Sequence, residues 1–398
     1  MLGGMTLYIG SQEAARRLGV RRETLYAYVS RGEIARRSAI DGRTSLYSVD
    51  DIDRLLGRTR GKQSPESRPS IDVQITSAIT QLDEQSPRYR GHEVVEVLCR
   101  TASFEQVAAL LWTGALPATA PEWPDALRDD VDACQAAVTA VGASATALQR
   151  MLVLAPVLGA RHSGDSATTA AQRLIVMVPA LVHQSASGPI AARLGRAWHQ
   201  EPSDQLAKAI DRALVLLADH ELATSTLAAR IATSVRASPY AAIAAALATV
   251  SGELHGSSAA AATHLLVDAS KRGAAAAIRA CLDAGLRVPG FGHTVYRTGD
   301  PRLSPLLEAV RLLPDPPSRL AVVEDVLAEA SVRVTPRPNV DFGLAALAFV
   351  GGLDAEVPIF AVARLAGWAA HIDEELAERP LRFRGLAKPV GPSLLDRP

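Results

Sequence analysis

Three short segments of the sequence carry side chains that can exchange protons and that lie beside glycine or at the end of an apolar run. They are SGELHGS with His255, VPGFGHTVY with His293, and PNVDF with Asp341. Glycine turns and helix ends can aim such side chains into a cleft. Two imidazoles and a carboxylate are the usual groups of general acid–base catalysis. A single histidine of this kind is more often a hydrogen-bonded structural residue, so the segments are informative as a set.

These segments are similar, in sequence and in order, to the catalytic signatures of citrate synthase. The matching stretches read LHG at 254–256, GFGHTVYRTGDPR at 290–302 and PNVDF at 338–342. Four more segments resemble motifs of this family: RYRG at 88–91, ASFEQVAALLW at 102–112, ADHELATST at 218–226 and ARLAGWAAH at 363–371. The resemblance runs from about residue 71 to about residue 391.

The resemblance implies that an acyl-CoA thioester is condensed with oxaloacetate to give a citrate-type acid and free CoA. Asp341 is then the base that removes a methyl proton, and His255, as neutral imidazole, stabilises the enol. His293 binds the ketone and protonates the alkoxide. We expect no metal and no permanently bound cofactor, with the CoA thioester as cosubstrate. Acetyl-CoA and propionyl-CoA both stay open.

Oxaloacetate needs fixed donors for its carboxylates, and guanidinium groups match a carboxylate in two parallel hydrogen bonds. By resemblance, Arg302, Arg364 and His220 are expected to bind it. Arg379 matches the family's arginine that reaches the active site of the partner subunit, which implies a homodimer. Singly, each of these arginines can also be interpreted as a surface ion pair.

For coenzyme A, the resemblance indicates the loop Gly290-Phe291-Gly292 directly before His293. Arg287 and Arg297 are expected to meet the CoA phosphates. Gly290 and Gly292 lie between them and allow the backbone to approach the adenine closely.

The chain departs from the family pattern at several positions. Glu253 and Ser257 replace a proline and a glycine on either side of His255, and a nearby carboxylate tends to favour imidazolium. Gly343-Leu344 stands where Tyr-Ser is common, and Phe383 replaces a tyrosine. No catalytic side chain is lost, but the acyl-chain preference and the local packing are open.

The elements that position these residues are expected to be helices. Alanine is abundant and aromatic residues make up 4% of the chain, which favours closely packed helices over strands. Residues recur at the spacing of one helix face in two places: Phe104, Val107 and Leu111, and then Leu206, Ile210, Leu214 and Leu217. We expect a mainly α fold with a large helical domain and a smaller domain, roughly 257–353, that closes over the substrates.

Length and charge limit the remaining possibilities. The 398 residues are enough for two or three domains. Lys plus Arg equals Asp plus Glu at 42 each, so any contact with nucleic acid or membrane must be local. Three scattered cysteines suit a reducing cytoplasm better than a disulfide framework. The sequence start lacks the features of a signal peptide and no apolar run is long enough for a membrane span, so we expect a cytoplasmic protein.

A separate module precedes the citrate synthase-like region. The pattern predicts helices at Ser11–Leu18 and Arg21–Ser30, a hairpin within 35–48 and a third helix at 49–56. This order resembles the winged helix-turn-helix of the MerR type, whose second helix and wing meet DNA. The residues expected to contact DNA are Arg21, Arg22, Arg36, Arg37 and Arg43.

We therefore expect a winged helix-turn-helix domain at 1–58, a linker at 59–70 and a citrate synthase-like domain at 71–398. Two alternatives stay open. The first module could be a docking domain with solvated arginines, because four aspartates dilute its positive charge. The whole chain could be a transcription regulator whose citrate synthase-like region senses a metabolite. Retention of the base Asp341 beside the binding arginines favours the enzyme, since a sensor does not need a base.

Overall fold

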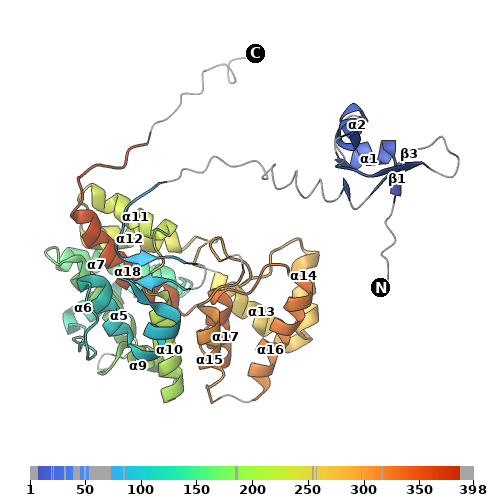
Figure 1. The fold of residues 1–398 in the computed structure, drawn as a ribbon. Helices are drawn as coiled ribbons and strands as arrows, with labels where there is room; N and C mark the ends of the chain where they lie inside the picture. The colour runs from blue at the N-terminus through green and yellow to red at the C-terminus, as the bar shows by residue number, and fades with distance from the viewer. Residues whose placement is uncertain are drawn as a thin grey trace, which may run out of the picture. The chain divides into compact units, whose positions relative to one another are not determined.

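The structure, a computed structural model of the chain, describes residues 8–18, 20, 22–30, 33–38, 45–48, 51–52, 73–83, 86–183, 187–252, 255–256, 258–296, 298–314 and 317–385. The chain forms two compact units, residues 1–75 and residues 76–398, and each is described on its own. The expected linker at 59–70 lies outside the described residues. The larger unit is mainly helical, as predicted (Figure 1).

The smaller unit combines two helices with an antiparallel sheet. Strand β3 (Ser45–Ser48) lies between β1 (Tyr8–Gly10) and β2 (Arg36–Ser38), while α1 (Ser11–Leu18) and α2 (Arg22–Ser30) follow β1 in the chain. A small apolar core joins them, and its buried members are Ala14, Ala15, Leu25, Ile34, Tyr47 and Ile52.

The predictions for this unit are confirmed where the structure describes it. Helix α1 has the predicted bounds, α2 is described from Arg22 to the predicted end at Ser30, and β2 pairs with β3 as the predicted hairpin. The hairpin turn lies outside the described residues, and only Asp51 and Ile52 of the third helix are described. The sequence does not predict β1, which pairs Ile9 with Tyr47, because a three-residue strand is too short to show alternation.

The larger unit begins with a small antiparallel sheet of β4 (Thr80–Gln81), β5 (Arg88–Tyr89) and β6 (His92–Glu93). A π-helical turn, η1 (Val94–Leu98), follows and leads into α4 (Cys99–Thr101).

The remaining helices form two groups (Figure 1). The first contains α5 (Phe104–Thr113), α6 (Arg128–Val141), α7 (Ala147–Arg161), α8 (Ala167–Ala180), α9 (Ile190–Trp198), α10 (Asp204–Leu217), α11 (Thr224–Ser234), α12 (Pro239–Val250) and α18 (Ile359–Leu376). The second contains α13 (Ser258–Arg272), α14 (Ala274–Asp283), α15 (Leu303–Val310), α16 (Pro317–Arg333) and α17 (Val340–Val350).

Local sequence explains where several helices begin and end. Ser103 starts α5 and Thr146 starts α7, and each hydroxyl accepts from a backbone N–H three residues later. The side-chain oxygens of Gln106 and Gln149 accept from the capping residues in return. Gly114 ends α5 with φ 79°, which glycine adopts without steric cost. Both predicted helix faces, on α5 and α10, are buried.

Helix α18 lies at the centre of the first group. It packs against α5, α8, α10, α11 and α12, and every residue from 361 to 372 is buried. The ionisable side chains in this stretch, Arg364 and His371, must therefore find partners inside the protein. No helix within the described ranges is long and apolar enough to cross a membrane.

Candidate active site

Four of the predicted site residues converge in the larger unit. His220 follows α10, His293 lies in the loop between α14 and α15, Arg302 directly precedes α15, and Arg364 lies on α18. The ring centroids of His220 and His293 are 5.4 Å apart. Tyr296 completes the group, since its ring centroid is 4.8 Å from that of His293 and 5.6 Å from that of His220.

His220 is a buried histidine with an unused nitrogen. It is 9% exposed, and burial together with the charges of Arg302 and Arg364 lowers its pKa well below the ordinary value. Nε2 of the neutral ring has no hydrogen-bond partner among the described residues. A buried polar atom without a partner is unfavourable, so this nitrogen is available to a ligand.

Arg302 is held in place by Asp300. Nε donates to one carboxylate oxygen at 2.9 Å and Nη2 to the other at 2.8 Å, and Arg302 is only 2% exposed. The same carboxylate accepts from the backbone N–H of Val340 at 3.0 Å. The start of α17 and the guanidinium are therefore fixed to one another.

Arg364 is a second buried guanidinium and is 1% exposed. Nε donates to the carbonyl oxygen of Leu217 at 3.1 Å, and the guanidinium carbon lies 4.7 Å from the ring centroid of Phe360. Nη1 has no partner among the described residues. The group is thus a desolvated cation with a free donor, which suits a carboxylate ligand.

His293 presents one nitrogen to the protein and the other to the site. Nδ1 accepts from the backbone N–H groups of Val295 at 3.1 Å and Tyr296 at 3.2 Å. Burial and the charge of Arg302 lower the pKa of His293, so the ring is neutral and its proton is on Nε2. That nitrogen lies 3.4 Å from Nη2 of Arg302. Two donors cannot bond each other, but both can donate to one ligand oxygen that lies beside the pair.

His255 lies in the turn between α12 and α13. Its Nε2 is 3.1 Å from the hydroxyl oxygen of Ser225 on α11, so Nδ1 is the nitrogen that this serine does not use. Burial and the charge of Arg364 lower the pKa of His255, which favours neutral imidazole. Glu253, expected to favour imidazolium, lies outside the described residues.

Asp341 lies in the first turn of α17. Asn339 caps this helix because its side-chain oxygen accepts from the N–H groups of Asp341 and Phe342. Burial raises the pKa of Asp341 above the ordinary value, against the opposing charge of Arg302. A carboxylate with a raised pKa is a better base, which suits proton removal from carbon.

The loop at 290–292 is hydrogen-bonded to Asn339, the residue that precedes α17. Asn339 donates from its backbone to the carbonyl oxygen of Gly290 at 2.9 Å and from its amide to that of Gly292 at 2.7 Å. Gly290 has φ 80°, and a Cβ there would lie 2.9 Å from the Cβ of Phe342. Only glycine fits both conditions. The loop that carries His293 is therefore held against the start of α17.

The other predicted substrate residues lie outside this group. Arg287 is exposed after α14, and Arg297 is not among the described residues. Arg379 is exposed beyond the end of α18.

Of the arginines predicted to contact DNA, Arg36 and Arg37 lie on β2 with exposed side chains. Arg22 begins α2. Arg21 and Arg43 lie outside the described residues.

The sequence analysis missed four residues that shape the site: Asp300, Tyr296, Ser225 and Phe360. Asp300 and Tyr296 lie inside the GFGHTVYRTGDPR segment and Ser225 lies inside ADHELATST, so the motifs did contain a signal. Phe360 carries no such signal, because its contacts with Arg364 and His255 depend on how α18 packs.

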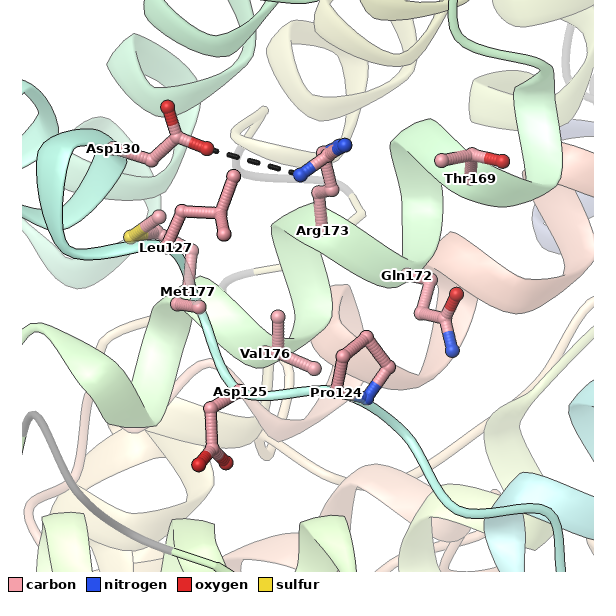
Figure 2. A pocket seen from close by; sticks show the side chains of 10 residues that line it. Pro124, Asp125, Leu127, Asp130, Thr169, Gln172, Arg173, Val176 and Met177 are labelled. Carbon is pink, nitrogen blue, oxygen red and sulfur yellow. Dashed lines mark ion pairs between the residues drawn. The ribbon is translucent and has the colours of Figure 1, made fainter.

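A hollow between α8 and the segment before α6 has different properties (Figure 2). Its charged lining residues are paired, Asp125 with Arg193, Asp130 with Arg161 and His162, and Arg173 with Asp165. It shares no lining residue with the histidine–arginine group and offers a ligand no unpaired charge.

Comparison with known proteins agrees with this geometry. Residues 72–386 match the family model "Citrate synthase, C-terminal domain", and residues 8–60 match "Helix-turn-helix domain". The 2-methylcitrate synthase of Mycobacterium tuberculosis is 29% identical over 378 residues, which cover 82% of this chain and 93% of the relative. The citrate synthase of Haloferax volcanii is 31% identical over 349 residues, covering 77% and 90% respectively.

Solved structures of low sequence identity show the same fold. Citrate synthase from Thermotoga maritima has a TM-score of 0.66 at 21% identity, covering 83% of this chain and 97% of that chain. Citrate synthase from Thermoplasma acidophilum, in a ternary complex with carboxymethyl-CoA and oxaloacetate, has a TM-score of 0.64 at 22% identity, covering 81% and 95%. With the sequence matches, these findings show that the chain belongs to the citrate synthase family and carries a helix-turn-helix domain before the family's domain.

Proposed function

We propose that this protein condenses an acyl-CoA thioester with oxaloacetate and releases a citrate-type acid and free CoA. One observation carries the proposal: buried His220 and Arg364 each keep a polar atom without a partner among the described residues, in the same site as a carboxylate, Asp341, whose pKa is raised. Membership of the citrate synthase family supports this reaction. A regulator that uses the larger unit as a sensor is not better supported.

Oxaloacetate would be bound by the histidine–arginine group. Among the described residues, Nη1 of Arg364 and Nε2 of His220 have no partner. Nη1 can donate to a carboxylate oxygen of the ligand, and Nε2 can do so when it carries the ring proton. Nε2 of His293 and Nη2 of Arg302 are 3.4 Å apart, so one ligand oxygen beside the pair can accept from both. Because the two histidines are neutral, they bind without adding charge, and the two guanidinium groups balance the two carboxylates.

The thioester methyl group would lie between Asp341 and His255. Asp341 removes a methyl proton, and the charge that develops on the thioester oxygen is stabilised by an N–H of His255. Since Nε2 of His255 faces Ser225, the donating atom is Nδ1. Neutral imidazole is a weak acid, as an enol is, so its N–H can share a proton with the enolate oxygen, and no imidazolium is needed.

The enol carbon then attacks the ketone carbon of oxaloacetate and forms the new carbon–carbon bond. Nε2–H of His293 donates to the ketone oxygen and protonates the alkoxide, while the backbone bonds to Nδ1 fix the ring. Water then cleaves the thioester of the product: the attacking water returns a proton to His293, and the proton held by Asp341 goes to the departing thiolate, which gives the acid and the CoA thiol.

We assign coenzyme A to the loop before α15. Arg287 and Arg297 would meet its phosphates, and the positive φ of Gly290 and Gly292 supports a backbone that comes close to the adenine. Helices α13 to α17, within 257–353, would close over it as a smaller domain. The names of the relatives include both citrate and 2-methylcitrate synthases, so acetyl-CoA and propionyl-CoA are both candidate substrates.

A homodimer is part of the proposal, with Arg379 entering the site of the partner subunit. This proposal is supported by the exposed position of Arg379, because the residues that follow it are held in place by hydrogen bonds. Leu381 donates from its backbone to Ser234 at 2.9 Å, and Arg382 donates to Glu375 at 2.7 Å. We also place the protein in the cytoplasm, since its cysteines are free.

The proposal is tested by steady-state release of CoA thiol from acetyl-CoA and from propionyl-CoA, each with and without oxaloacetate. We expect release that requires oxaloacetate and is faster with one thioester. Release that is the same without oxaloacetate would contradict condensation. No release from either thioester would leave the larger unit as a sensor.

A second function, DNA binding, is proposed for the smaller unit. Residues 8–60 match a helix-turn-helix domain, and exposed Arg36 and Arg37 lie on β2 of the expected wing. In such domains the second helix, here α2, enters the major groove, and two copies in a dimer favour a pseudo-palindromic site.

Electrophoretic shifts against fragments of the source genome test this second function. Replacing Arg36 and Arg37 by alanine should weaken binding on all sequences and reduce its dependence on salt, because fewer phosphate counterions are released. Deleting residues 1–60 should leave condensation intact. Failure to shift any specific fragment at low salt would favour a docking domain.

A further inference from the structure

A set of charged side chains, most of them buried, lies next to the histidine–arginine group, which we also call the substrate group. The mechanism above does not use this set. We call it the Arg230 network; its members are Asp219, Arg230, His371, Glu374 and Glu375. Asp219, Arg230 and His371 have no exposed surface. Buried charges lose their hydration, so they must be compensated by bonds within the protein.

Helix α18 forms one side of the network through its period. Arg364 and His371, two turns apart, share the face that looks onto the end of α10. Gly367 lies between them and lets the helix approach, because a Cβ there would overlap Asp219 and lie 2.5 Å from the carbonyl oxygen of Ala218. The same helix therefore carries the proposed oxaloacetate ligand Arg364 and the partner of Asp219.

The hydrogen-bond partners of His371 determine which of its ring nitrogens carries the proton. Nη1 of Arg230 is 3.0 Å from Nδ1 of His371, and a guanidinium can only donate, so Nδ1 is the acceptor. The proton of the neutral ring is then on Nε2, which donates to Oδ2 of Asp219 at 3.3 Å. Burial opposes ionisation of Asp219, but His371 and Arg364 hold its pKa below the ordinary value, so it remains an acceptor.

The outer end of the network fixes Arg230. Nε donates to Glu375 at 2.9 Å and Nη1 donates to Glu374 at 2.5 Å. Glu375 also accepts from Arg382 at 2.7 Å, and Glu374 accepts from the backbone N–H of Ala78 at 2.8 Å. With Nε and Nη1 both engaged, Arg230 has little freedom to turn away from His371, although its Nη2 has no partner among the described residues.

The inner end of the network controls the turn that carries His220. Oδ2 of Asp219 accepts from the backbone N–H of Glu221 at 2.9 Å as well as from His371. Glu221 has φ 54°, a strained conformation for a residue with a side chain. The turn therefore depends on the bond from Glu221 to the carboxylate of Asp219. The hydroxyl of Tyr89 donates to the carbonyl oxygen of Asp219 at 3.0 Å. His220 lies between the two residues that are held.

We propose that His371 and Arg230 are positioning residues for oxaloacetate: they orient Asp219, which fixes the turn at 219–221 and thereby places the ring of His220. The inference rests on the proposed function, because it takes His220 as an oxaloacetate ligand. Neither positioning residue touches the reacting atoms. Loss of their bonds should therefore weaken oxaloacetate binding and leave acyl-CoA binding unchanged.

The test uses variants of the full-length protein, with oxaloacetate affinity from calorimetry and KM and kcat from CoA release. His371→Leu removes both bonds, and we expect oxaloacetate Kd and KM to rise about 10-fold or more, with the KM for acyl-CoA within about 2-fold of wild type. His371→Gln should recover most of the loss, since its amide can accept from Arg230 and donate to Asp219.

The matched control is His162→Leu. Nε2 of His162 bonds the buried Asp130 at 2.7 Å, so this variant breaks a pair of the same type outside the substrate group and should not change oxaloacetate affinity. Equal losses in the two leucine variants, or an unchanged oxaloacetate KM in folded His371→Leu, would overturn the inference. If His371→Leu does not fold, Arg230→Lys is measured instead, with the same selective loss expected and an unchanged oxaloacetate KM counting against the inference.

The wild-type protein separates this result from a failure of the proposed function. A wild type that neither binds oxaloacetate nor releases CoA would overturn both proposals. A wild type that does both, beside an unaffected His371→Leu variant, would overturn only the positioning role.

Discussion

Two clusters in the larger unit contain the same types of side chain and differ in how these are bonded. Around the buried Asp130, Arg161 donates at 2.6 Å and His162 lies at 2.7 Å, so the carboxylate is satisfied on both oxygens. In the substrate group, buried His220 and Arg364 each keep an atom that has no partner in the described part of the chain. Histidine, arginine and aspartate in company therefore do not mark a site. Buried polar atoms without a partner are a better indication where several gather, as those of His220 and Arg364 do beside His293, because one ligand can then bond to more than one of them.

The two clusters also shift their carboxylates in opposite directions. Burial favours the protonated form of both Asp341 and Asp130. At Asp130 the bonds from Arg161 and His162 outweigh burial and lower the pKa, whereas at Asp341 burial prevails and the pKa is raised. The lowered pKa of Asp130 favours stability at neutral pH, and the raised pKa of Asp341 suits the proton transfer proposed for it.

The largest expected effect is on catalysis. Asp341→Asn should lower kcat for condensation by about 10²–10⁴-fold or to background, because no other base faces the methyl group. Oxaloacetate affinity should stay close to wild type. Asp130→Asn, the same change in the paired cluster, should keep kcat. CoA release by the two variants measures the difference, and a fully active Asp341→Asn would remove Asp341 from the mechanism.

The next effect is on oxaloacetate binding. Arg364→Leu should weaken it by about 2–5 kcal/mol, as is typical when one partner of a desolvated charge pair is lost. Arg302→Leu should act similarly but also destabilise the fold, because it leaves buried Asp300 without its cation. Arg173→Leu, beside the hollow of Figure 2, should leave the affinity unchanged. Calorimetric titration that finds unchanged affinity in the first two variants would falsify the assignment.

A smaller effect, of opposite sign in the two clusters, is expected on stability at pH 7. The raised pKa of Asp341 means that its ionisation destabilises the fold as pH rises above the unfolded-state value, so Asp341→Asn should raise Tm. The lowered pKa of Asp130 gives stability that is present above the unfolded-state value and lost as pH falls through the folded-state value. Asp130→Asn should therefore lower Tm at pH 7, and its difference from wild type should close in acid. Thermal melts measure both variants against wild type at pH 7 and in acid. A change of Tm in the same direction for Asp341→Asn and Asp130→Asn at pH 7 would contradict the contrast.

The smallest signal is expected from subunit mixing. Asp341→Ala and Arg379→Ala chains, each impaired alone, should regain activity when mixed, because one site of each mixed dimer combines the intact Asp341 of one chain with the intact Arg379 of the other. CoA release after demonstrated subunit exchange is the measurement. No recovery would argue against a shared site.

What the sequence could predict depends on how local each feature is. The face of Phe104, Val107 and Leu111 follows from helical spacing alone, and the structure confirms it. His220 and Arg302 were found through motifs, which fix residue identity but not partners. The role inferred for His371 could not be predicted, because ARLAGWAAH does not say which side of the helix meets Asp219. Such partners depend on the packing of α18 against α10, which no local pattern reports.

The central claim is condensation at the carbon next to the thioester carbonyl, and acetyl-CoA or propionyl-CoA deuterated at that carbon tests it most directly. Incubation with oxaloacetate should give a citrate-type acid that has lost one deuteron from the reacting carbon, with CoA released in equal amount. The mass of the acid reports this loss, and Asp341→Asn should give none of the product. Free acetate or propionate with every deuteron retained would show plain thioester hydrolysis and contradict the account.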